Sequence, residues 1–220
     1  MSLKLIMNLW MLVCSLGGTI YGFYRFYRPK KALFLKMVVA GVSCLMFTEL
    51  FMVIYMATQG DLEPGINVGM LGMIGSFMFL LSANYGQMDG LVDNKSKELR
   101  PTRIKALAAP IVIILLYILF CVLVTPIKVR IPVGIVTAFI VPCSYYNFKH
   151  IIIYDVKLGI IRLLRPYNIL ALAYAVLTML YFIGLYANIT PLYIVSCVGI
   201  GLIAAAIIPV LKRGVDKWIM

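Results

Sequence analysis

The sequence predicts an all-α integral membrane protein, a bundle of about seven transmembrane helices. Three observations support this prediction. Of the 220 residues, 63% are apolar and only 13% are charged, whereas soluble chains have roughly 45–50% apolar and about 25% charged residues. The apolar residues form runs close to the ~20 residues that a helix needs to cross the hydrocarbon core. The basic residues lie between these runs, as the positive-inside rule describes.

Taken in order along the chain, the apolar runs predict one transmembrane domain over residues 1–220 and no soluble domain. The first run, 5–24, follows Lys4 in the way of a secretory signal, but it lacks a small-residue cleavage site. We therefore expect it to remain as the first span. The further predicted spans are 37–57, 66–86, 107–126, 131–148, 167–187 and 190–211.

The basic residues predict how these spans are oriented. When the connections are assigned alternately to the two sides of the membrane, all of the 20 lysines and arginines except Lys4, Lys128 and Arg130 fall on one side. That side is cytoplasmic, so we expect the N-terminus outside and the C-terminus inside a bacterial-type cytoplasmic membrane. The formal charge of +12 then reflects topology, with no nucleic-acid partner. The expected partners of this face are membrane lipids with anionic headgroups.

A segment between the fifth and sixth spans, residues 150–165, has too many charges to cross the membrane and too many apolar residues for a free loop. Its charged residues gather on one side of a helical projection, and most of its apolar residues lie on the other. The charged residues are His150, Asp155, Lys157, Arg162 and Arg165. We expect a short amphipathic helix that lies along the cytoplasmic interface.

The reactive side chains exclude several classes of site. The five cysteines lie apart within apolar runs, and the single histidine, His150, has no partner at the spacing of a zinc site. We therefore expect no disulfide, metal or cofactor. No predicted span holds both a serine and a histidine, which excludes a buried serine nucleophile with its base. No catalytic residue can be assigned, and binding without chemistry is favoured over enzyme activity.

One acidic residue lies well inside a span, where ionisable groups are costly and frequently functional. Glu49 is about 13 residues into the second span, which is about 19 Å along a helix that rises about 1.5 Å per residue. We interpret it as a carboxyl that binds a ligand or takes part in proton-linked transport. The alternative interpretation is a hydrogen bond between two helices.

The third span combines a packing face with a polar end. Small residues recur along one of its faces, which favours close contact with a neighbouring helix. They are Gly65, Gly69, Gly72, Ser76 and Ala83. The end of the span gathers Ser82, Asn84, Gln87 and Asp89 at the predicted cytoplasmic interface. We interpret this end either as the rim of a ligand site or as a capped and solvated helix end.

The sixth span contributes hydroxyl groups to one helical face: Tyr167, Tyr174, Thr178 and Tyr181. If the second and sixth spans face each other, these hydroxyls give Glu49 partners and line a polar cavity. The predicted ligand-binding residues are Glu49, Ser76, Ser82, Asn84, Gln87, Asp89, Tyr174, Thr178 and Tyr181. Tyrosines on membrane helices also pack with a single hydrogen bond each, which is the competing interpretation.

The function that these features favour is binding of a lipid-like or small amphipathic molecule, by a receptor, a sensor or an accessory subunit. Seven spans with Arg28-Pro29 before the second and Arg165-Pro166 before the sixth resemble the three-plus-one-plus-three plan of small sugar and vitamin carriers, which would imply solute transport. The size, the hydropathy and a buried acid are similar to those of the lysoplasmalogenase family, which would imply lipid hydrolysis. A second copy of this chain or another membrane protein stays open as a partner.

Overall fold

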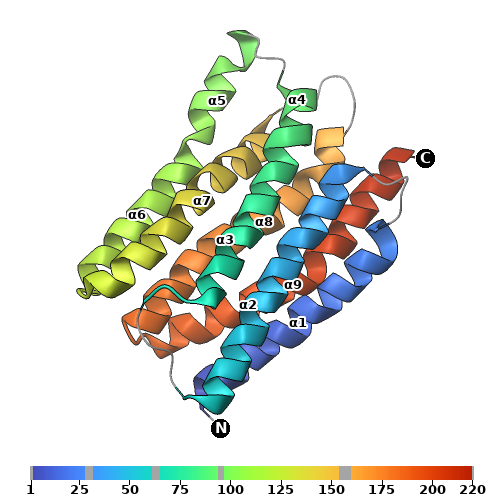
Figure 1. Cartoon of the computed structure of the whole chain (residues 1–220). Coiled ribbons are helices and arrows are strands. Elements are labelled where there is room, and N and C mark those ends of the chain that lie inside the picture. The colour runs from blue at the N-terminus through green and yellow to red at the C-terminus, as the bar shows by residue number, and fades with distance from the viewer. Residues whose placement is uncertain (1, 28–31, 61–64, 94–96, 154–159, 220) are drawn as a thin grey trace.

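A computed structural model of the chain describes residues 2–27, 32–60, 65–93, 97–153 and 160–219 (Figure 1). Every regular element in these residues is helical. Seven helical segments in them are long and apolar enough to cross a membrane, which confirms the predicted all-α class and the predicted number of spans. The protein is therefore a multi-pass membrane protein.

The helices follow one another with short connections. The first, second and third spans are α1 (Leu3–Phe26), α2 (Leu33–Thr58) and α3 (Val68–Ala83), the last of which continues through a π-helical turn (Asn84–Met88) into α4 (Asp89–Val92). A 3-10 turn (Lys97–Leu99), α5 (Arg100–Ala106) and α6 (Ala108–Leu123) make up the fourth span. The remaining helices are α7 (Ile127–Ile152), α8 (Ile160–Tyr186) and α9 (Thr190–Ile219).

Six of the helices pack side by side in a ring (Figure 1). Going round the ring, α1 contacts α2, α2 contacts α3, α3 contacts α7, α7 contacts α8, α8 contacts α9, and α9 returns to α1. The helix left outside the ring is α6, which packs against α7 and α8. The N-terminal end of the bundle is the end where α1 begins, and the C-terminal end is the end where α9 ends. The sequence predicts that the N-terminal end is external and that the C-terminal end is cytoplasmic.

The outward faces of the helices are apolar, as a lipid environment requires. On α6, Leu115 and Val122 are 57% and 71% exposed, and on α1 Val13 is 60% exposed. In a water-soluble protein such continuous apolar faces would be buried against a partner. In a membrane they are solvated directly by the hydrocarbon chains of the lipids. The buried side of the ring holds the larger apolar side chains, including Phe77 and Met179.

Glycines bring the ring helices into close contact. A Cβ atom on Gly18 of α1 would overlap the main-chain carbonyl oxygen of Ala204 on α9. A Cβ atom on Gly72 of α3 would overlap the hydroxyl of Thr48 and lie 3.0 Å from the Cys44 carbonyl oxygen on α2. The small-residue face of the third span is therefore a packing face directed at α2, where backbones approach as they do in other membrane helix pairs.

The middle of the predicted amphipathic helix at residues 150–165 lies outside the described residues, since residues 154–159 are not described. Its beginning belongs to α7, in which His150 is buried, and its end belongs to α8, where the Arg165 guanidinium donates a hydrogen bond to the Ile153 carbonyl oxygen at 3.0 Å. The interfacial helix and the orientation of the bundle stay predictions.

Candidate functional site

Two clusters of polar side chains occur among the described residues, one inside the ring around Glu49 and one at the C-terminal end of the bundle. Glu49 on α2 is 1% exposed. Its Oε2 atom has no hydrogen-bond partner among the described residues. The side chains of Tyr174 and Tyr181 on α8 and Tyr193 on α9 are close enough to interact electrostatically with it. The structure therefore brings together Glu49 and the two tyrosines that the sequence places beside it, and adds Tyr193.

Hydrogen bonds inside the ring connect α8 with α3. The Tyr174 hydroxyl donates to the Ser76 hydroxyl at 3.3 Å, and the Tyr174 ring stacks on that of Phe77 with centroids 4.6 Å apart. The Thr178 hydroxyl donates to the Tyr174 carbonyl oxygen at 2.8 Å, within its own helix. Of the predicted residues on these helices, Ser76 and Tyr174 thus form a hydrogen bond between helices, whereas the hydrogen bond of Thr178 stays within α8.

Two small cavities lie beside this cluster. One of about 20 Å³ is lined by Thr48 and Tyr181, and one of about 10 Å³ is lined by Ser76 and Tyr174. A water molecule needs roughly 10–15 Å³ measured in the same way, so neither cavity holds more than about one water. A larger ligand can reach Glu49 only if the ring helices move apart.

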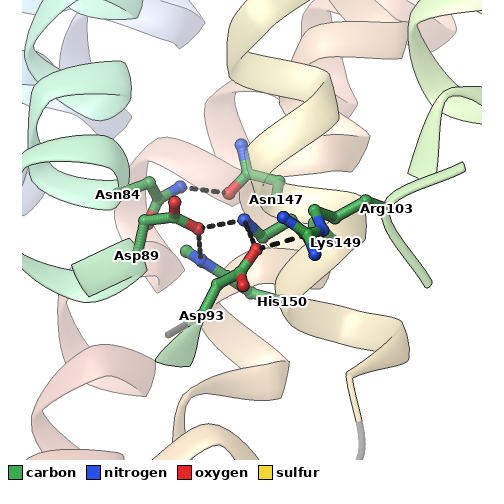
Figure 2. A network of polar contacts seen from close by, with 7 residues as sticks. All are labelled: Asn84, Asp89, Asp93, Arg103, Asn147, Lys149 and His150. Carbon is green, nitrogen blue, oxygen red and sulfur yellow. Dashed lines mark hydrogen bonds and ion pairs between the residues drawn. The ribbon is translucent and has the colours of Figure 1, made fainter. Parts of the chain in front are cut away.

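A network of charged side chains joins α4, α5 and α7 at the C-terminal end (Figure 2). Lys149 is 2% exposed, and its ammonium group lies 2.5 Å from Asp89 Oδ1 and 2.9 Å from Asp93 Oδ2. The same Asp89 oxygen is 3.3 Å from Nε2 of His150. The guanidinium of Arg103 lies 3.8 Å from Asp93. A lysine buried to this extent is tolerated because both carboxylates compensate its charge.

The network shifts the pKa of Asp89. Partial burial is the largest single influence and by itself would raise this pKa. Hydrogen bonds with His150 and Lys149, together with electrostatic interactions with both residues, have the larger combined effect, so the pKa of Asp89 lies below its ordinary value. Asp89 is consequently ionised at neutral pH and balances the charge of Lys149.

A pair of amide side chains holds the C-terminal end of α3 against α7. The Asn84 Nδ2 group donates to Asn147 Oδ1 at 2.7 Å (Figure 2). Asn147 Nδ2 donates in turn to the Cys143 carbonyl oxygen at 2.8 Å. Both asparagines are 0% exposed. The contact ties the first residue of the π-helical turn to α7.

The π-helical turn changes which side chains share a face. An uninterrupted α-helix would place Ser82, Gly86 and Asp89 on one face, as the spacing in the sequence suggests. The wider turn over Asn84–Met88 shifts the helical phase. In the structure Gly86 is exposed, while Asp89 turns towards Lys149.

The polar end of the third span is therefore split among different environments. Asn84 and Asp89 belong to the network at the C-terminal end, and Ser82 is half-buried on α3. The side chain of Gln87 lies outside the described residues. None of the contacts described above joins Asn84 or Asp89 to Glu49.

Five members of the network were not among the predicted site residues: Asp93, Arg103, Asn147, Lys149 and His150. The available signal was the spacing of Asn147 and His150, three residues apart on one face of a helix. This spacing is easily overlooked because hydropathy places the end of the fifth span before Lys149. Lys149 then resembles any basic residue that follows a span on the cytoplasmic side. No group of three or more histidine, cysteine or acidic side chains suited to a metal occurs among the described residues.

No protein-family model matches the chain, and comparisons with curated proteins and with solved structures find no significant match. The fold and composition define a multi-pass membrane protein, and the evidence for a more specific role has to come from its own residues.

Proposed function

We propose that the protein binds a lipid-like or small amphipathic molecule inside the helix ring, with Glu49 as the polar anchor. In this role it acts as a receptor, a sensor or an accessory subunit in a bacterial-type cytoplasmic membrane. The observation that carries the proposal is the Oε2 atom of Glu49, which has no hydrogen-bond partner among the described residues although Glu49 is only 1% exposed.

Energetics favour a partner for this atom. A buried polar atom without a hydrogen bond costs roughly 1–3 kcal/mol. A ligand that supplies a hydrogen-bond donor recovers this free energy, and Tyr174 and Tyr181 provide a wall for its apolar part. The side chains that surround Glu49 are thus suited to a molecule with a polar head and an apolar body.

Native mass spectrometry of the protein, purified in a mild detergent, tests this proposal. We expect a bound molecule on the wild-type chain and its loss in Glu49→Met, which removes the polar atoms and keeps a similar volume. Glu49→Gln separates the need for a charge from the need for a hydrogen bond. The matched control is Glu98→Gln, because Glu98 is exposed at the C-terminal end. Equal occupancy of the same adduct in wild type and Glu49→Met would contradict the proposal.

A second candidate, a small-solute carrier, is favoured by the helix arrangement. The fourth span is the one outside the ring, so two sets of three helices remain, α1–α3 and α7–α9. If the two sets are equivalent halves, α1 corresponds to α7 and α3 corresponds to α9. The first helix of each set should then pack on the third helix of the other, and α1 does contact α9 as α7 contacts α3. Uptake of the identified adduct by proteoliposomes tests this candidate. Uptake that exceeds that of empty liposomes and is lost in Glu49→Met supports transport, and binding without uptake supports a sensor or accessory role.

A further inference from the structure

A cavity larger than the two beside Glu49 opens at the N-terminal end of the bundle. We propose that it is the entrance to the Glu49 site, that Leu185 and Tyr193 form its closed gate, and that it admits a small amphipathic molecule instead of a complete lipid. This inference rests on the proposed ligand site at Glu49 and adds its route of access and the class of ligand.

The cavity has a volume of about 240 Å³ and lies between the starts of α1 and α9 and the end of α8. Its lining includes Lys4, Asn188 and Thr190, so a solute inside it meets polar groups. Drug-sized ligands occupy roughly 300–1,000 Å³, so the cavity suits a smaller molecule and excludes a lipid with two acyl chains.

Leu185 separates this cavity from the interior of the ring. Its side chain lines the entrance cavity and also the cavity of about 20 Å³ whose wall includes Tyr181. Tyr181 in turn interacts electrostatically with Glu49. A displacement of Leu185 therefore joins the two cavities and leads towards the buried carboxyl.

Tyr193 is the second barrier. It lines the entrance cavity, its ring centroid lies 5.6 Å from that of Tyr181, and it interacts electrostatically with Glu49. The Asn8 side chain, which is 0% exposed, donates to the Tyr193 hydroxyl at 3.5 Å. The Asn8 Oδ1 atom has no hydrogen-bond partner among the described residues.

The unpartnered atoms indicate the chemistry of the solute. Asn8 Oδ1 and Glu49 Oε2 lie on residues that both interact with Tyr193, and both are oxygens that can accept hydrogen bonds. A solute with hydroxyl or amine hydrogens satisfies them in turn as it moves inward. At the opposite end, the contacts of Lys149 with Asp89 and Asp93 hold α4 against α7. This leaves the N-terminal end as the side of access.

A native thiol behind the gate permits a direct test. Cys197 is 0% exposed, lies one turn after Tyr193 on α9, and interacts electrostatically with Glu49. An anionic, membrane-impermeant methanethiosulfonate is added to spheroplasts, and peptide mass spectrometry measures the rate of modification at each cysteine. We expect slow modification of Cys197 in the wild type and a rise of about tenfold or more in Leu185→Ala. Adding Thr190→Trp, which fills the entrance cavity, should reverse most of that rise.

Two internal controls separate an open gate from a loosened fold. Leu202→Ala changes a lipid-facing residue of α9 that is 54% exposed, and it should leave the rate at Cys197 unchanged. Cys143 is 0% exposed on α7, towards the other end of the bundle, and its rate should stay low in every variant. If Leu185→Ala accelerates both thiols, the smaller truncation Leu185→Val is measured, and it must accelerate Cys197 alone.

An unchanged rate at Cys197 in Leu185→Ala, or equal acceleration of Cys143 in Leu185→Val, would overturn the proposed entrance. These outcomes are independent of the proposed function. If the gate variants behave as expected but Glu49→Met retains the adduct seen by native mass spectrometry, the binding site at Glu49 is wrong and the entrance stands. If Glu49→Met loses the adduct and Cys197 does not respond, only the entrance is wrong.

Discussion

Replacing Lys149 by methionine removes the ammonium group that Asp89 and Asp93 share at the C-terminal end of the bundle. The side chain of Lys149 is 3% exposed and that of Asp93 is 4% exposed, so water compensates little of the lost contact. Removing one partner of a buried ion pair costs about 3–5 kcal/mol of folding free energy. We expect a loss near the lower bound, about 3 kcal/mol, because His150 still contacts Asp89 and Arg103 still contacts Asp93.

Two further variants test this reasoning. Asp89→Asn removes one of the two uncompensated charges, so the double variant should lose less stability than the sum of the single variants, by about 1–2 kcal/mol. Lys105→Met is the matched control, because Lys105 is exposed on α5 and its replacement should change stability by less than about 0.5 kcal/mol.

The measurement is equilibrium unfolding in mixed micelles with a rising mole fraction of sodium dodecyl sulfate, followed by circular dichroism. Ordinary polar contacts between membrane helices contribute only about 0.6 kcal/mol on average. A loss of that size in Lys149→Met, or additive effects of Lys149→Met and Asp89→Asn, would refute the assignment of Lys149 as a buried charge that both carboxylates hold.

Two other predictions use the same unfolding assay. The pKa of Asp89 is lowered in the folded chain, so its contribution to stability is complete above the ordinary aspartate pKa of about 3.9 and is lost as the pH falls from there through the lower folded pKa. The stability difference between wild type and Asp89→Asn should therefore be constant from pH 7 to pH 5 and shrink below pH 4. A change in that difference between pH 7 and pH 5 would contradict this prediction. Gly17→Ala should stabilise the chain by up to about 1 kcal/mol, since alanine favours the helix and nothing lies within 4 Å of the new Cβ, whereas Gly18→Ala should destabilise it by about 1–3 kcal/mol because its Cβ overlaps the Ala204 carbonyl oxygen. Equal effects of the two adjacent substitutions would show that α1 and α9 are not in close contact.

Hydropathy predicts the number of spans well because each must bury about 20 residues in hydrocarbon. It predicts their ends less well, as the fifth span shows. That span is predicted as 131–148, whereas α7 extends over Ile127–Ile152. The helix continues past the charged residues because they find local partners: the Arg130 guanidinium donates to the Val124 carbonyl oxygen at 2.5 Å, and Lys149 contacts two carboxylates.

The two polar clusters differ in how far sequence reasoning reaches. Glu49 and the α8 tyrosines could be placed together because depth in the membrane and helical period are both readable from spacing. The network at the C-terminal end joins Lys149 to Asp93, 56 residues away, and His150 to Asp89, 61 residues away. Neither depth nor period specifies such pairs, and the π-helical turn alters the period just before Asp89.

The ring closes between α1 and α9, which constrains the order of assembly during synthesis. The glycine face of α1 meets Ala204 and Ile208 of α9. At about 5–20 residues per second, a ribosome needs about 10 to 40 s to add the roughly 190 residues between these partners. During this delay the nascent α1 has its α2 contact but not its α9 contact. When α9 leaves the ribosome, it thus completes the seam that α1 began.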